Sequence, residues 1–163
     1  MPEPLLEVKD LKVHFPTDDG IVKAVDGLSF TMQAGETLGV VGESGSGKSV
    51  SFLTVMGLIN RKSAIIEGEV LFQGQNLVQM TNDELREIRG EKISIIFQEP
   101  MTSLNPLHTI EKQVGEIMKL HHGLDDQTVR RRVLELLRKV GLPEPQKRLG
   151  AFPHQLSGGQ RQR

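Results

Sequence analysis

The sequence contains no cysteine, which excludes disulfide bonds and thiolate metal sites and fits a reducing compartment. It also lacks a long apolar run, since the longest mostly apolar stretch, residues 50–59, is shorter than the ~20 residues of a membrane-spanning helix. The basic and apolar segments of a signal peptide are not seen at its beginning. A net charge of −1 gives no general attraction to nucleic acid or to anionic membranes. We therefore expect no nucleic-acid partner, and expect any contact with a membrane to go through another protein.

What is present is ordinary for a globular domain: 163 residues, 37% of them hydrophobic and 25% charged. Thr81 and Glu84 form a capping box that predicts a short helix to about Arg89. Apolar spacing predicts two amphipathic helices, at residues 109–120 and 125–140. Alternating or continuous apolar runs predict strands at residues 5–15, 21–25, 28–32, 37–41, 68–75 and 92–97. This order predicts a mixed α/β part followed by a helical part.

A glycine-rich segment fits the pattern G-x-x-x-x-G-K-[ST] without a mismatch. Glycines let the backbone approach a ligand, and successive N–H groups can then surround an anion. The predicted buried strand at 37–41 and a helix from about Gly47 give the context that this motif requires. The alternative, a Gly/Ser-rich linker that matches by chance, is disfavoured by these flanks. The residues of this phosphate loop are Gly42, Glu43, Ser44, Gly45, Ser46, Gly47, Lys48 and Ser49.

A second segment, Leu-Ser-Gly-Gly-Gln at residues 156–160, is also suited to an anion. Ser157 is a good N-cap, and Gly158 and Gly159 would expose the first N–H groups of a following helix. Taken alone, an ordinary serine-capped helix start is the simpler interpretation.

The pairing of the two motifs changes that interpretation. A phosphate loop followed by this signature segment (residues 156–160) resembles the ATP-binding subunit of ABC transporters. Between them, Phe97-Gln98-Glu99-Pro100 stands where that family has its Q-loop. Residues 98–106, Gln-Glu-Pro-Met-Thr-Ser-Leu-Asn-Pro, resemble the branch that imports dipeptides, oligopeptides or nickel. The resemblance covers residues 5–163.

The resemblance implies a fold and a ligand. The fold would be α/β, a RecA-like P-loop NTPase domain with an antiparallel β subdomain and phosphate-loop core at about 5–97 and a helical subdomain at about 98–163. The ligands would be ATP and Mg²⁺. Phe15 would stack on adenine, with a place in the β core as the equal alternative. Residues 42–49 would hold the phosphates, and Ser49 and Gln98 would contact Mg²⁺, with Gln98 also positioning the attacking water.

The resemblance also implies partners. Ser157, Gly158, Gly159 and Gln160 would contact the γ-phosphate of ATP bound by a second ATP-binding subunit, identical or paralogous. The segment 99–106 would contact the transmembrane permease subunits at the cytoplasmic face of the membrane. An extracytoplasmic solute-binding protein would act through those permeases. The cargo is not determined by the sequence, because this branch serves dipeptides, longer peptides, nickel and glutathione.

In the family, the acidic strand end, the general base and the switch histidine needed for hydrolysis lie downstream of the signature segment. We therefore expect these 163 residues to lack part of the parallel sheet, to fold poorly or associate, and to bind ATP at most. A regulatory module that binds nucleotide without hydrolysis is one alternative. A non-transport ABC ATPase acting on ribosomes or DNA is another, and residues 98–106 argue against it.

Overall fold

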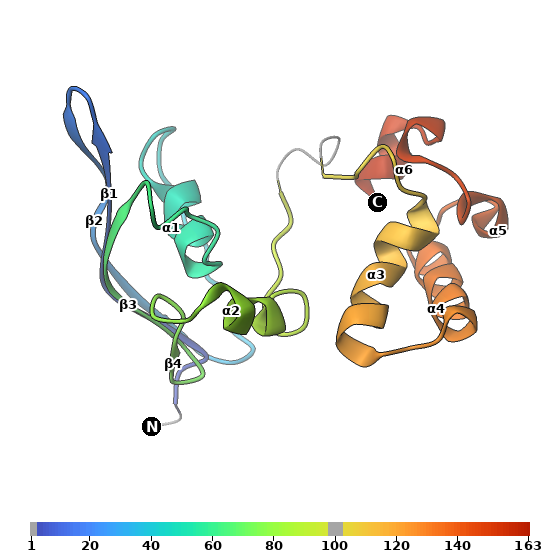
Figure 1. The fold of residues 1–163 in the computed structure, drawn as a ribbon, viewed down its shortest axis with the longest axis horizontal. Helices are drawn as coiled ribbons and strands as arrows, with labels where there is room; N and C mark the ends of the chain where they lie inside the picture. Colours follow the sequence, from blue (N-terminus) through green and yellow to red (C-terminus); the bar gives the residue numbers. More distant parts are fainter. Residues whose placement is uncertain (1–2, 98–102) are drawn as a thin grey trace. The chain divides into compact units, whose positions relative to one another are not determined.

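The computed structural model describes residues 3–97 and 103–163. The chain divides into two compact units, residues 1–89 and residues 90–163. We call them the β unit and the helical unit. Strands and two helices make up the first, and the remaining helices make up the second (Figure 1).

The β unit is built on an antiparallel sheet in the order β2-β1-β3-β4. The strands are β1 (Leu6–Thr17), β2 (Gly20–Met32), β3 (Ile65–Phe72) and β4 (Gln75–Asn76). The predicted strands at 5–15 and 68–75 correspond to β1 and to β3 with β4. The prediction of two strands at 21–25 and 28–32 is wrong, because β2 is continuous. Asp26 and Gly27 lie within it, at a shift in the pairing register with β1 instead of a turn.

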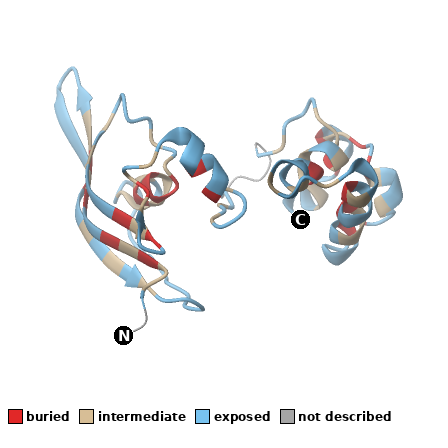
Figure 2. Ribbon diagram, turned by 60° about the horizontal axis from the view of Figure 1, so that its bottom comes forward, coloured by how far each residue is buried: buried red, intermediate tan, exposed pale blue. Residues whose placement is uncertain are grey.

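A bulge in β1 keeps one face of the sheet apolar along its length. Leu6 and Val8 are buried before the bulge, and Leu11 and Val13 are buried after it. Because side chains alternate along a strand, one extra residue between the two pairs is needed to return them to the same face. Asp10 provides it with a φ of 46°, and the register to both neighbouring strands shifts there. Buried positions accordingly recur along the strands in Figure 2.

Two helices complete the β unit: α1 (Lys48–Val55) and α2 (Asn82–Ile88). The predicted capping box of α2 is confirmed, since the Thr81 hydroxyl accepts from the Glu84 N–H and the Glu84 side chain accepts from the Thr81 N–H. Leu85 and Ile88 bury the inner face of α2.

Two predicted strands are not formed. Residues 37–41 and 92–97 are irregular apart from a bridge at Ile93, and Val41 and Ile96 are 94% and 95% exposed. A buried parallel strand needs neighbouring strands on both sides. Among the described residues, the sheet ends at β2 on one edge and at β4 on the other, and neither segment has such neighbours.

The helical unit packs two long helices, α3 (Ile110–His122) and α4 (Asp126–Lys139), with the shorter α5 (Pro145–Arg148), η2 (Pro153–Gln155) and α6 (Gly158–Gln162). Both predicted amphipathic helices are confirmed. Gly115 lets α3 and α4 approach closely, because a Cβ there would lie 2.5 Å from Val129 Cγ1. The buried core comprises Ile110, Val129, Val133, Leu137, Leu142, Leu149, Ala151 and Leu156. Within residues 3–97 and 103–163, no helix is long and apolar enough to cross a membrane.

Candidate nucleotide site

The phosphate loop lies in the β unit and leads into α1, as its sequence predicts. Gly47 is the residue before the helix, with a φ of 87° that disfavours any side chain. A Cβ at Gly47 would also lie 2.3 Å from the carbonyl oxygen of Ala24, on β2. Glycine is therefore required twice at this position, once by the backbone angle and once by contact with the sheet.

The loop presents several free backbone donors. In the part of the chain that the structure describes, the N–H groups of Gly45, Gly47, Lys48 and Ser49 have no hydrogen-bond acceptor. The first N–H groups of a helix lack intrahelical partners, and here they adjoin the donors of the loop. Such free N–H groups carry a partial positive charge, which favours the binding of a phosphate group.

Lys48 is folded back onto the loop. Its ammonium group donates to the carbonyl oxygens of Gly42 and Glu43, both at 2.6 Å, and to Ser46 Oγ at 3.2 Å. A Cβ at Gly42 would lie 2.7 Å from Ser46 Oγ, so a side chain there would require the Ser46 hydroxyl to move. The ammonium group is thus held over the loop. A polyanion could replace the two carbonyl groups as the acceptor of its hydrogen bonds. Ser49 is exposed on the first turn of α1.

Phe15 lies near the end of β1, opposite Val22 of β2, and is half-buried. It belongs to the same unit as the phosphate loop. Its stacking on adenine stays a prediction. Gln98 and residues 99–102 lie outside the described residues.

The signature segment lies in the helical unit, where Ser157 caps α6 as predicted. The Ser157 hydroxyl accepts from the Gln160 N–H at 3.3 Å, and the Gln160 side-chain oxygen accepts from the Ser157 N–H at 3.1 Å. Among the described residues, nothing lies within 4 Å of a Cβ placed at Gly158 or Gly159, and neither glycine has a positive φ. The fold of this chain therefore does not itself require glycine at these two positions.

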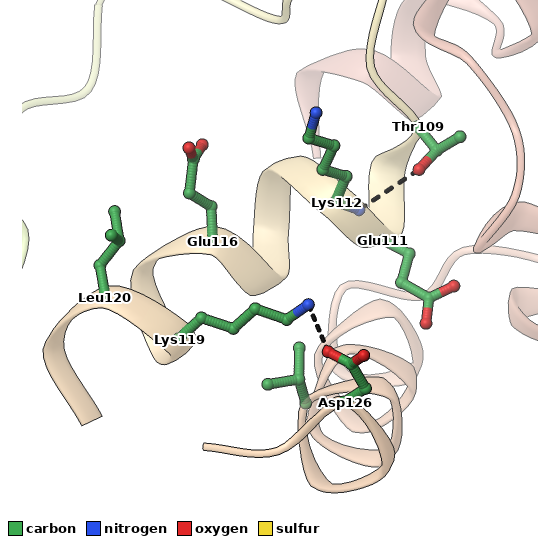
Figure 3. Close-up of a pocket in the computed structure, with 8 residues that line it drawn as sticks. Thr109, Glu111, Lys112, Glu116, Lys119, Leu120 and Asp126 are labelled. Atoms are coloured by element: carbon green, nitrogen blue, oxygen red, sulfur yellow. Dashed lines mark hydrogen bonds and ion pairs between the residues drawn. The ribbon is translucent and has the colours of Figure 1, made fainter. Parts of the chain in front are cut away.

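A groove of about 510 Å³, lined mostly by charged residues, lies between α3 and α4, and the sequence did not indicate it (Figure 3). Lys119 pairs with Asp126 at 2.5 Å across the two helices, and Glu111 pairs with Arg130 at 3.1 Å. Thr109 caps α3 at the end of the groove. Three of the five charged residues that line the groove are thus in ion pairs, and we assign no ligand to it.

The comparison with protein families matches residues 25–163 to the ABC transporter family. The oligopeptide transport ATP-binding protein OppD of Haemophilus influenzae is 51% identical over 98% of this chain. The peptidoglycan transport ATP-binding protein YejF of Agrobacterium fabrum is also 51% identical, over 99% of this chain. The chain spans 49% and 30% of the length of these two relatives.

Solved structures agree on the fold. A dimeric structure of MJ0796, described as a bacterial ABC transporter cassette, is 28% identical with a TM-score of 0.81, covering 96% of this chain and 65% of that one. A second structure of that cassette, bound to ADP and Pi, has a TM-score of 0.79 at 26% identity over the same shares. The predicted α/β cassette fold is confirmed, and so is the resemblance to peptide-import subunits that residues 98–106 indicated. This chain belongs to the ABC transporter family.

Proposed function

We propose that this chain is part of an ATP-binding subunit that couples ATP binding and hydrolysis to the import of peptides, or of nickel or related small solutes. The carrying observation is the set of free N–H groups at residues 45 and 47–49, with the Lys48 ammonium beside them. Support for peptides comes from the names of the relatives, which include oligopeptide and peptide import ATP-binding proteins.

The residues present fit a magnesium nucleotide. The free N–H groups would donate to phosphate oxygens, and Lys48 would exchange the carbonyl groups of Gly42 and Glu43 for the β and γ oxygens. Ser49 would offer its hydroxyl to Mg²⁺, together with Gln98. When bound, Mg²⁺ neutralises charge on the β and γ oxygens. Phe15 would stack on adenine.

The glycines of the signature segment support a second subunit. The described part of this chain gives no reason for glycine at positions 158 and 159, and glycine there would allow the close approach of another molecule. We propose that Ser157, Gly158, Gly159 and Gln160 contact the γ-phosphate of ATP bound by that subunit, identical or paralogous.

The turn after the Q-loop supports contact with permease subunits through residues 99–106. Gln113 of α3 accepts from the Asn105 N–H at 2.8 Å and donates to the carbonyl oxygens of Asn105 and His108 at 3.0 and 2.8 Å. Leu107, at the tip of this fastened turn, is 80% exposed. We propose that this turn meets the permeases at the cytoplasmic face of the membrane, with a solute-binding protein outside.

We further propose that the boundary between the family's two subdomains lies near residues 97 and 98 of this chain.

Calorimetric titration of the full chain with MgATP tests the nucleotide site. We expect saturable binding of MgATP and of magnesium tripolyphosphate, because the free N–H groups and Lys48 contact phosphates only. Adenosine serves as the matched control, and we expect it to bind far more weakly. A chain that binds adenosine as well as MgATP, or binds neither, would contradict the proposal.

A further inference from the structure

The side chain of Arg89, the C-terminal cap of α2, reaches the end of α1 that lies farthest from the phosphate loop. Its Nε donates to the carbonyl oxygen of Met56 at 2.7 Å, and its Nη2 donates to the carbonyl oxygen of Gly57 at 2.6 Å. Hydrogen bonds from a guanidinium group are stronger than those between neutral groups. Helix α1 therefore ends on a cation supplied by another helix.

The two carbonyl groups are available because of how α1 ends. Gly57 adopts a φ of 63°, its N–H donates to the carbonyl oxygen of Thr54, and the Leu58 N–H donates to that of Leu53, both at 2.8 Å. This Schellman arrangement satisfies the carbonyl groups of Leu53 and Thr54. Arg89 binds those of Met56 and Gly57, which follow the helix at the negative end of its dipole, where a positive charge is favourable.

The fit between the two helices is close. A Cβ at Gly57 would lie 2.7 Å from Leu85 Cδ1 and 2.8 Å from Arg89 Nη2. Leu85 is 2% exposed. Burial, with the positive charges of Arg61 and Arg86 nearby, lowers the pKa of Arg89. The unfavourable surroundings of the guanidinium group are offset by its two carbonyl acceptors.

We propose that Arg89 is a positioning residue for the phosphate loop, which it acts on through α1. This inference rests on the proposed nucleotide function. Helix α1 has eight residues and is about 12 Å long, so we treat it as one rigid element, a short rod. Its first turn rests on the carbonyl group of Ala24 through Gly47, and its last turn is held by Arg89. Without Arg89 the rod can tilt, which displaces the N–H groups of residues 47–49 from the phosphates.

The experiment compares Arg89→Ala, Arg89→Lys and Arg61→Ala in the full chain. Arg61 is the matched control, since it also donates from its guanidinium group to a backbone carbonyl of the β unit, that of Leu77 at 3.2 Å. Affinities for MgATP and magnesium tripolyphosphate are measured by calorimetry at a temperature where each variant is folded. Hydrogen exchange of the α1 amides is measured without ligand.

We expect Arg89→Ala to weaken binding of both ligands by the same factor, about tenfold, and to speed exchange in α1. Lysine keeps the charge but not the planar fork, so Arg89→Lys should recover part of the affinity. Arg61→Ala should bind within about twofold of the natural chain. A general loss of stability would not speed exchange in α1 alone, so faster exchange confined to α1 distinguishes the positioning role from it.

Full affinity in folded Arg89→Ala, or an equal loss in Arg61→Ala, would overturn the inference. If Arg89→Ala does not fold, Arg89→Lys provides the test. An Arg89→Lys variant with the affinity and the α1 exchange rate of the natural chain would then overturn the inference. A natural chain that binds neither ligand overturns the proposed function, and this inference with it. A natural chain that binds both ligands, with unaffected Arg89 variants, overturns this inference alone.

Discussion

The two glycine-rich motifs of this chain differ in what holds them. In the phosphate loop, the N–H groups of Gly45, Gly47, Lys48 and Ser49 are without acceptors in the described structure, and the glycine at 47 is required by a backbone angle and by Ala24. In the signature segment, the N–H groups of Ser157 and Gln160 are used by a capping box, and no close contact explains the glycines.

This difference separates a site formed within one unit from one that needs another molecule. The phosphate loop is shaped by its own neighbours, the β2 strand and the α1 helix. The signature segment is a short capped helix with an open surface above its glycines. Substitutions in the two motifs should therefore differ, first in their effect on folding and then in their effect on ligand binding.

The largest effect should come from cavities in the two cores. Leu149→Ala, in the helical unit, and Leu85→Ala, in the β unit, each remove a side chain that is at most 2% exposed. Each should lower the free energy of unfolding by about 2–5 kcal/mol, because the cavity is not refilled. Since the units have separate cores, hydrogen exchange should rise mainly in the substituted unit. Equal acceleration in both units by either variant would show that they unfold together.

The next effect concerns the cation of the phosphate loop. Lys48→Ala should weaken MgATP binding about 100-fold, or about 2.7 kcal/mol, because the charge nearest the phosphates is lost. Ser157→Ala is the comparison in the other motif. It should lower the stability of the helical unit by about 1 kcal/mol and leave MgATP binding to a single chain unchanged. Calorimetry measures the MgATP affinity of both variants, and thermal unfolding measures their stability. A large loss of MgATP affinity in Ser157→Ala would contradict the expected difference between the two motifs.

Alanine at one glycine of each motif gives a smaller effect. Gly47→Ala should cost at least about 1–2 kcal/mol of unfolding free energy, because a Cβ disfavours the left-handed backbone angle and also meets the Ala24 carbonyl oxygen. Gly159→Ala meets nothing within 4 Å and should change stability by less than about 0.5 kcal/mol. Denaturant titration of the two variants provides the test. Equal losses of unfolding free energy would mean that the surface at Gly159 is covered in solution.

The smallest effect should be on the dependence of stability on pH. Hydrogen bonds from the Thr128 hydroxyl and from the N–H groups of Thr128 and Gln127 lower the pKa of Asp125. Hydrogen bonds from the N–H and hydroxyl of Thr81 lower the pKa of Glu84. A carboxylate with a lowered folded pKa stabilises above its unfolded pKa, about 4, and this is lost as pH falls through the folded value.

Asp125 lies in the helical unit and Glu84 in the β unit, so the contribution of each to acid sensitivity can be measured by substitution. Asp125→Asn should reduce the loss of stability below about pH 4 in the helical unit only, and Glu84→Gln in the β unit only. Thermal unfolding between neutral and acid pH, read by unit through hydrogen exchange, distinguishes the two. An unchanged pH profile in both variants would assign the acid sensitivity to other groups.

The parts of the fold that the sequence predicted well are those set by near neighbours. The capping box of Thr81 and Glu84 and the cap at Ser157 each act within one helical turn, so the pattern and the structure coincide. The strands at 37–41 and 92–97 were predicted from apolar runs alone. A parallel strand forms only beside other strands, and no local pattern reports whether those are present. The turn predicted at Asp26-Gly27 is absent for a related reason. Bulges and turns favour the same residue types, so the sequence pattern does not distinguish them.

The sequence by itself determined the family, the phosphate loop and the helix caps, because these depend on residue types at fixed short spacings. Only the tertiary structure decided what surrounds the loop. The carbonyl group of Ala24 against Gly47 and the guanidinium group of Arg89 on Met56 and Gly57 join residues from separate elements. Such contacts arise when β2 and α2 pack on α1, and a single sequence carries no periodic signal for them. In the helical unit, the tertiary structure decided that no described residue lies within 4 Å of a Cβ at Gly158 or Gly159.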